Sequence, residues 1–259
     1  MTPEERVRLC PLASGSKGNS IFVSCGNLSL LIDAGLSGVE TEKRLKASGI
    51  SPDSLDAIVV THEHSDHIKG VGVLSRRYHI PVYINRQTYE AVPKIGRLAG
   101  VEFFNCGTAF NINGVRIDPF TTSHDAADPS GLTLSYGDAK IGIATDMGVA
   151  TALVKQRLKD CSLLYIESNH DPDMLIKGPY PWPLKQRIRG RQGHLSNEDT
   201  GHLLKELAGK ELKHVILAHL SEKNNTPEKA YQSACAVLEP LGIGIDVAMP
   251  HEPGSVVNL

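Results

Sequence analysis

The chain is dominated by short apolar runs of the kind that form β-strands. Ile21–Cys25 and Leu28–Asp33 are rich in aliphatic residues, and the Gly26-Asn27 pair between them favours a tight hairpin turn. Leu55–Thr61 contains four consecutive apolar residues, which predicts a buried strand. Further strands are predicted at Ile80–Ile84, Val115–Phe120, Leu132–Tyr136, Lys140–Thr145, Leu163–Ile166 and Val215–Ala218.

Helices are predicted between these strands. Ser196 fits the N-cap of a helix that ends before Gly209, with Asp199 three residues into it. Thr226-Pro227 opens another helix that runs to about Leu238, because proline suits the first helical turn. The remaining predicted helices are Glu40–Ala47 and Ala150–Lys159. Ser168–Leu195 has no regular pattern, and irregular segments of that length are usually functional or disordered.

Strands and helices are therefore interspersed in both halves of the chain. An α/β (α+β) fold, in which two mixed sheets pack face to face with helices outside, satisfies this pattern. The 259 residues are enough to bury a substantial core without disulfide bonds.

Composition and charge indicate which classes of protein the chain can belong to. The net charge of -2, with 41% hydrophobic and 22% charged residues, is ordinary for a soluble globular protein, so a nucleic-acid partner would need a local basic patch. No apolar run approaches the ~18 residues of a membrane helix, and the first residues lack the apolar centre of a secretory signal. We therefore expect a cytoplasmic location and no membrane partner. The five cysteines are far apart and odd in number, which argues against a disulfide framework and a thiolate zinc site.

The densest chemical signal is the segment T-H-E-H-S-D-H at residues 61–67, directly after the predicted buried strand. His62 and His64 alternate, so an extended segment points both the same way. Asp66 and His67 are adjacent, and a turn after His64 would aim them at a second ion. The spacing thus predicts two divalent metal ions; the alternative is a polar loop that is rich in histidine by chance. Zinc is the first expectation, and manganese or iron also suits imidazole and carboxylate ligands.

This motif resembles the H-x-H-x-D-H signature of the metallo-β-lactamase superfamily. Four further segments match in the family's order, namely those around Asp33 (L-I-D-A-G), His124 (T-S-H-D), Asp146 (A-T-D-M-G) and His219 (L-A-H-L). The resemblance implies a single αββα domain over residues 1–259. It also implies one metal held by His62, His64 and His124, a second held by Asp66, His67 and His219, and Asp146 bridging them. Asp33 would orient the ligands rather than bind a metal.

The superfamily contains β-lactamases, lactonases, thioesterases, phosphodiesterases and nucleases, and the fold alone cannot choose among them. Three flanking segments, Ser14–Ser20, Glu167–Asp171 and Gly193–Asn197, together with the metal motif, resemble the bacterial YycJ (WalJ) branch. That resemblance implies a 5′-to-3′ exonuclease on DNA that is linked to DNA repair. In this interpretation a hydroxide that bridges the metals attacks phosphorus.

Several residues are candidates for contact with such a substrate. Backbone N–H groups of the Ser14–Ser20 loop can cradle phosphate oxygens, although a plain tight turn fits the loop equally well. His194 precedes a helix N-cap, where anions are favoured, and is the candidate proton donor. The predicted catalytic residues are Asp66 and His194, and the predicted substrate-binding residues in these loops are Ser16, Asn19, Ser20, Asn169, His170 and His194. His170 equally fits a loop pair with Asp171.

Four basic residues alternate over Lys185–Arg191. In an extended segment they would line one face that suits a phosphate backbone, with Arg187 and Arg189 binding substrate. Trp182, just upstream, could stack on a base. A solvated loop is the alternative interpretation.

Two other functions compete with the nuclease. The first is hydrolysis of a carbonyl compound such as a lactone, thioester or β-lactam, either as the main or as a promiscuous activity. Many β-lactamases of this fold depart from an all-His/Asp ligand set and most are exported, which favours the nuclease here. The second is a metal-binding regulatory or scaffold protein, which a degraded ligand set would favour, whereas every ligand position here matches. The sequence does not predict an oligomeric state.

Overall fold

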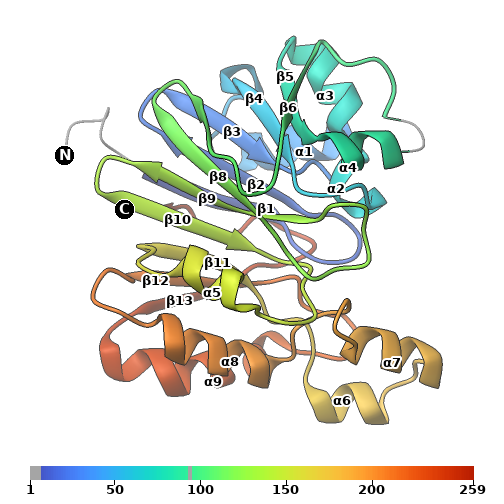
Figure 1. The fold of residues 1–259 in the computed structure, drawn as a ribbon, viewed down its shortest axis with the longest axis vertical. Helices are drawn as coiled ribbons and strands as arrows, with labels where there is room; N and C mark the ends of the chain where they lie inside the picture. Colours follow the sequence, from blue (N-terminus) through green and yellow to red (C-terminus); the bar gives the residue numbers. More distant parts are fainter. Residues whose placement is uncertain (1–6, 93–94) are drawn as a thin grey trace.

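Two seven-stranded mixed sheets lie face to face with helices on their outer sides, which confirms the predicted αββα sandwich (Figure 1). The computed structural model describes residues 7–92 and 95–259. Most of the N-terminal segment in which we expect no secretory signal therefore lies outside the described residues. In the described part of the chain, no helix is both long and apolar enough to cross a bilayer.

The first sheet has the strand order β14-β1-β2-β3-β4-β5-β6. The hairpin predicted at Gly26-Asn27 joins β2 to β3, and parallel pairing continues from β3 to β6. Its strands are β1 (Val7–Ala13), β2 (Ser20–Cys25), β3 (Leu28–Ile32), β4 (Ala57–Val60), β5 (Pro81–Asn85), β6 (Gly100–Phe104) and β14 (Val257–Asn258). The helices on this side are α1 (Gly38–Ala47), α2 (Ser65–Ile68), α3 (Val71–Tyr78) and α4 (Arg86–Ala91), with a short 3-10 helix at Pro52–Ser54.

The second sheet has the order β13-β12-β11-β10-β9-β8-β7, antiparallel from β7 to β10 and parallel from β10 to β13. Its strands are β7 (Phe110–Ile112), β8 (Val115–Thr121), β9 (Ser130–Tyr136), β10 (Ala139–Ala144), β11 (Leu163–Glu167), β12 (His214–Ala218) and β13 (Gly244–Val247). Helices α5 (Ala152–Leu158), α8 (Asn197–Leu207) and α9 (Pro227–Leu238) cover its outer face, and a 3-10 helix follows at Glu239–Leu241. The predicted capping box of Ser196 and Asp199 opens α8.

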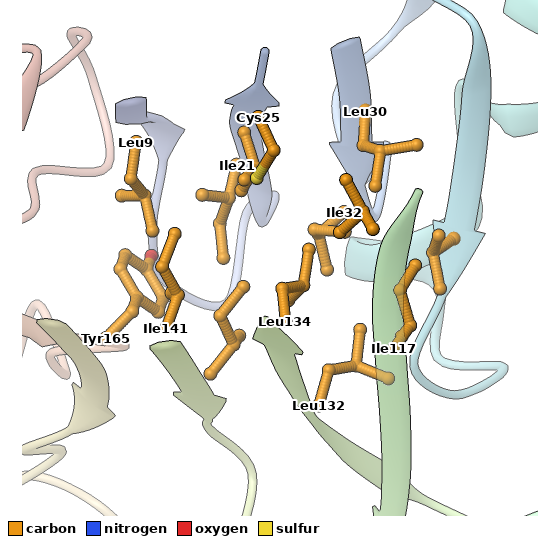
Figure 2. Packing of buried hydrophobic residues seen from close by; sticks show 14 of the residues in the cluster. Leu9, Ile21, Cys25, Leu30, Ile32, Ile117, Leu132, Leu134, Ile141 and Tyr165 are labelled. Atoms are coloured by element: carbon orange, nitrogen blue, oxygen red, sulfur yellow. The ribbon is translucent and has the colours of Figure 1, made fainter. Parts of the chain in front are cut away.

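The central strands are buried on both faces, which explains their unbroken apolar runs. In β11, Tyr165 belongs to the core between the sheets, whereas Leu164 and Ile166 pack under the outer helices. Figure 2 shows Leu9 and Ile21 of the first sheet facing Ile141 and Tyr165 of the second. Each such fully buried aliphatic side chain stabilises the fold by roughly 1.5–3 kcal/mol.

The predicted structure of residues 168–195 is wrong in two respects. The segment is not irregular: it forms α6 (Pro172–Lys177) and α7 (Trp182–Arg189), and a proline occupies the first turn of each. The basic residues of Lys185–Arg191 do not share an extended face, because the helical period separates them. Lys185 is buried, and its ammonium donates to the carbonyl oxygens of Ile176 and Gly178 at 2.6 and 2.8 Å. Figure 1 shows α6 and α7 projecting together from one end of the molecule.

Candidate metal centre

The residues of the metal motif gather where strands of both sheets end. His62 and His64 follow β4, His124 follows β8, and Asp146 and His219 follow β10 and β12. The segment after β4 stays extended through His64, and α2 begins at Ser65. This turn redirects Asp66 and His67 toward His219, while the His67 ring still lies beside that of His62, with 4.0 Å between the ring centroids.

Three histidines form the first ligand cluster. One ring nitrogen of each of His62, His64 and His124 lies within 4.8 Å of the others. Nε2 of His62 is 3.1 Å from Nδ1 of His64. The structure thus brings together the residues predicted to hold the first metal.

The second cluster contains Asp66, His67 and His219, whose ligand atoms also lie within 4.8 Å of one another. Oδ2 of Asp66 is 3.6 Å from Nε2 of His67 and 3.9 Å from Nε2 of His219. Asp146 lies between the clusters: one oxygen is 3.4 Å from Nε2 of His67 and the other 3.8 Å from Nε2 of His124. A carboxylate in this position suits a bridge between two metals.

The histidine rings are oriented by hydrogen bonds at Nδ1. His62 contacts the Thr61 hydroxyl at 3.1 Å, and His124 contacts the Gly193 carbonyl at 3.2 Å. His67 contacts Oδ2 of Asp33 at 2.7 Å, and Oδ1 of Asp33 accepts the Thr61 N–H at 2.8 Å. A bond at Nδ1 leaves Nε2 as the nitrogen that can face a metal, and Nε2 of His67 also lies 3.0 Å from the Asn19 amide nitrogen. Without a metal, burial lowers the pKa of His67, but the carboxylates of Asp33 and Asp146 outweigh this effect and raise the pKa to about 9.

Two buried atoms that lack hydrogen bonds within the described chain support metal binding in the centre. Nε2 of His219 and Oδ2 of Asp146 are buried, and no described residue gives either atom a hydrogen bond. Buried polar atoms without partners are rare because they cost free energy. Metal ligation would satisfy both atoms, and a set of only imidazole and carboxylate donors suits zinc, manganese or iron. The residues present therefore fit divalent metal ions.

Glu167 is a central residue that begins one of the flanking segments quoted above, although no role was predicted for its side chain. It ends β11 with a fully buried side chain. Oε1 accepts from Nδ1 of His194 at 2.7 Å and from Nδ1 of His219 at 3.0 Å. Oε2 accepts from the backbone N–H groups of Met147 and Leu195 at 3.0 and 3.2 Å. Burial would raise the pKa of Glu167, but the charges and hydrogen bonds of His194 and His219 hold it below the ordinary value.

Left-handed backbone conformations direct the side chains of three residues into the metal centre. Asp33, Asp146 and His219 have φ angles of 58°, 57° and 56°, and each lies within two residues of the end of a strand. Outside glycine this conformation is uncommon and costs on the order of 1–3 kcal/mol. The surrounding hydrogen bonds hold the three residues there, and the sharp change of direction turns their side chains into the centre.

The Ser14–Ser20 loop braces the metal motif. The backbone N–H of Asn19 donates to the Asp66 carbonyl at 2.7 Å, and the Asn19 amide lies 3.1 Å from Oδ2 of Asp66. Gly35 permits this approach, because a Cβ there would collide with the Asp66 carbonyl. Ser20 donates to the Asp33 carbonyl at 3.0 Å. Asn19 and Ser20 thus contact the metal motif and the residue that orients it, whereas Ser16 is exposed at the entrance.

A cleft of about 350 Å³ opens over the clusters. Of the predicted substrate-binding residues, Ser16, Asn169, Arg187 and His194 line it. Tyr180, Leu184 and Ile188, from the α6–α7 connection and α7, form an apolar wall. His170 and Arg189 are not part of the lining: His170 is buried, which lowers its pKa to about 4, and Arg189 faces a neighbouring depression.

Replacing Asp33 by asparagine is expected to weaken metal binding about 10–100-fold. The residue keeps its size and tolerates the left-handed backbone, but one carboxylate oxygen becomes an NH₂ group. That group cannot accept from Thr61 or from His67, so the His67 ring loses its fixed orientation. Competition with a chromogenic chelator would measure the change, with Asp53→Asn on the exposed 3-10 helix as the control. Equal affinity in the variant and the wild type would contradict this role.

Comparisons with known proteins agree with this geometry. The family model described as "Beta-lactamase superfamily domain" matches residues 29–220. The chain is 40% identical to "Exodeoxyribonuclease YycJ" of Bacillus anthracis, over 92% of this chain and 91% of that protein. It is 38% identical to "Exodeoxyribonuclease WalJ" of Streptococcus pneumoniae serotype 2, over 91% and 90%.

A solved structure shows the same fold at low identity. The metallo-β-lactamase fold protein YhfI from Bacillus subtilis superposes with a TM-score of 0.78 at 17% identity, covering 98% of this chain and all of that one. The family match and the two relatives show that the chain belongs to the metallo-β-lactamase superfamily, in its YycJ/WalJ-like branch.

Proposed function

We propose that this metal-dependent hydrolase is a phosphodiesterase with two metal ions that acts as a 5′-to-3′ exonuclease on DNA. One observation carries the proposal: both candidate ligand clusters, Asp146 between them and the cationic Arg187 border one cleft. The names of the relatives, exodeoxyribonucleases YycJ and WalJ, point to the same substrate class. A cytoplasmic location and a role in DNA repair stay predictions from the sequence.

The proposed chemistry divides between metals and side chains. Two divalent ions supply a nucleophile from water at neutral pH and neutralise charge on a phosphoryl group. Asp66, which lines the cleft, would help to hold the second ion with His67 and His219. Arg187 lies at the rim, where its guanidinium pairs with Asp125 at 2.9 Å, and it contacts a phosphate of the bound strand.

His194 is the proposed proton donor to the leaving oxygen. It lines the cleft with one-fifth of its side chain exposed. Glu167 holds Nδ1 of the ring, so Nε2 is the nitrogen that can face a substrate. A ring whose orientation is fixed by a buried carboxylate is well placed to pass a proton to a departing oxygen.

Wild-type protein loaded with manganese or with zinc is expected to shorten 5′-phosphorylated DNA one nucleotide at a time from the 5′ end. Single-stranded and duplex oligonucleotides carrying a 3′ label would show a regular ladder on a denaturing gel. Protein stripped with a chelator serves as the control and should be inactive until metal is restored. The ion that restores the fastest digestion is the working metal.

Two results would contradict the proposal in different ways. Stepwise loss from the 3′ end would reverse the direction but keep the exonuclease. No digestion with either metal would overturn the phosphodiesterase, and lactones and β-lactams would be tested next.

A further inference from the structure

Two depressions on the surface adjoin the cleft over the metal centre. The cleft shares Arg187 and Gln192 with a neighbouring depression beside Ser123 and Asp125. That depression shares Arg191 with a third, which reaches α5 and α8. The three hollows follow one another away from the metal centre past residues 190–192, and this series is here called the exit groove.

Two cations of the exit groove are not neutralised. Arg187 is paired with Asp125, and Lys155 is paired with Glu206 at 2.6 Å. Arg189 and Arg191 are exposed, and no carboxylate of residues 7–92 or 95–259 forms an ion pair with either.

The acidic groups along the groove do not cancel its cations. Glu206 is paired with Lys155, whereas the Asp199 carboxylate keeps its charge while it accepts from the Ser196 hydroxyl at 2.6 Å in the cap of α8. The basic side chains on this path are Lys155, Arg187, Arg189 and Arg191, and the acidic ones are Asp125, Asp199 and Glu206. One positive charge is therefore in excess, and it lies outside the metal centre.

The turn that carries Arg191 is fixed to the body of the protein. The Ser123 hydroxyl donates to the Arg191 carbonyl at 2.7 Å, and the Ser123 carbonyl accepts from the Gly148 N–H at 2.9 Å. Gly148 lies so close beneath the turn that a Cβ would collide with the Gly190 carbonyl. The side chain of Arg191 thus extends from a backbone that is held in place, which reduces the entropy lost when it binds a ligand.

We propose that the DNA strand held at the metal centre continues as a single strand along the exit groove, with successive phosphates on Arg191 and Arg189. The inference rests on the proposed nuclease function and adds the course of the substrate beyond the scissile bond. A positively charged groove that follows a flexible backbone is the usual means of binding a single strand without regard to sequence. Each arginine donates hydrogen bonds to phosphate oxygens that a dinucleotide would not provide.

The test compares substrates of two lengths in the Arg189→Ala/Arg191→Ala variant. We expect kcat/KM for a 20-nucleotide strand, relative to that for a dinucleotide, to fall roughly ten-fold or more. Binding of a 3′-labelled oligo(dT) of 20 nucleotides, measured by fluorescence anisotropy, should weaken to a similar extent. Its dependence on salt should flatten by about 0.7 in log–log slope for each lost phosphate contact. The control is Lys43→Ala/Lys46→Ala on α1. This variant also loses two positive charges, but from a helix that lies beside the first sheet.

The outcomes separate this inference from the proposed function. Equal loss for the dinucleotide and the long strand would place both arginines at the metal centre and overturn the groove. Unchanged binding and digestion of the long strand would overturn it as well. If the wild type binds the long strand and the variant binds it weakly, but neither digests DNA, the result supports strand binding in the exit groove and contradicts the nuclease function.

Discussion

Replacing Asp66 by alanine is expected to reduce DNA hydrolysis on the order of 10³-fold or more. Its carboxylate lies within 4 Å of Nε2 of both His67 and His219, so its loss removes one proposed ligand and a negative charge that would balance the metal. Metals in such sites contribute several kcal/mol to catalysis, and about 1.4 kcal/mol corresponds to a factor of ten in rate. Rates on DNA, together with metal content by elemental analysis, would measure the effect.

The fold should survive this substitution. Asp66 is partly exposed at the floor of the cleft, and α2 is anchored by backbone bonds that do not involve the side chain. The control is Asp173→Ala, which removes an exposed carboxylate from α6 and should leave the rate unchanged. A thermally stable Asp66→Ala protein that keeps more than a tenth of the wild-type rate would show that Asp66 is not an essential ligand.

Replacing Glu167 by glutamine should lower activity roughly 10²–10³-fold and weaken metal binding at the second cluster. All four hydrogen bonds to this side chain come from donors, two of them ring nitrogens and two of them backbone N–H groups. If the new NH₂ group faces Met147 and Leu195, it lies opposite their two backbone N–H groups, and no acceptor remains for either hydrogen bond. If it faces the rings, it donates to Nδ1 of His194 and His219 and moves their protons to Nε2. His219 then cannot bind a metal and His194 presents its ring in the other tautomer.

This prediction needs variants that separate positioning from folding. Glu167→Asp keeps the charge but is one methylene shorter, so we expect partial activity and partial metal affinity. Glu198→Gln, in the exposed first turn of α8, is the matched control. A shifted pH–rate profile in Glu167→Asp would be the signature of an altered His194. Normal rates and a normal profile in folded Glu167→Gln would refute the positioning role.

The metal motif was predictable because its geometry is local. Alternation after β4 places His62 and His64 on one side, and the turn at Ser65 redirects the next two ligands. The distant candidate ligands, His124, Asp146 and His219, could be named only through the family resemblance. Their approach depends on sheet pairing and on left-handed backbone conformations that no local pattern reveals.

The parts of the structure that were predicted wrongly or missed also have physical explanations. The alternation of basic residues at Lys185–Arg191 favoured an extended segment, but the proline in the first turn and the buried ammonium of Lys185 stabilise α7. Glu167 was missed because a sequence does not show that β11 lies between the strands leading to Asp146 and His219. A carboxylate that directly ends a run of buried apolar residues was the available signal.

The order of the ligands along the chain constrains when the metal centre can form during protein synthesis. His62 to His67 leave the ribosome early, whereas His219 and its neighbours follow after much of the second sheet. At roughly 5–20 residues per second, the wait lasts roughly 8–30 seconds. His219 is then fixed by a bond from its backbone N–H to the Ser14 hydroxyl, which joins segments 205 residues apart. We therefore expect nascent chains to carry an incomplete ligand set until residue 219 has emerged, so that the ion of the second cluster is acquired after the ion of the first.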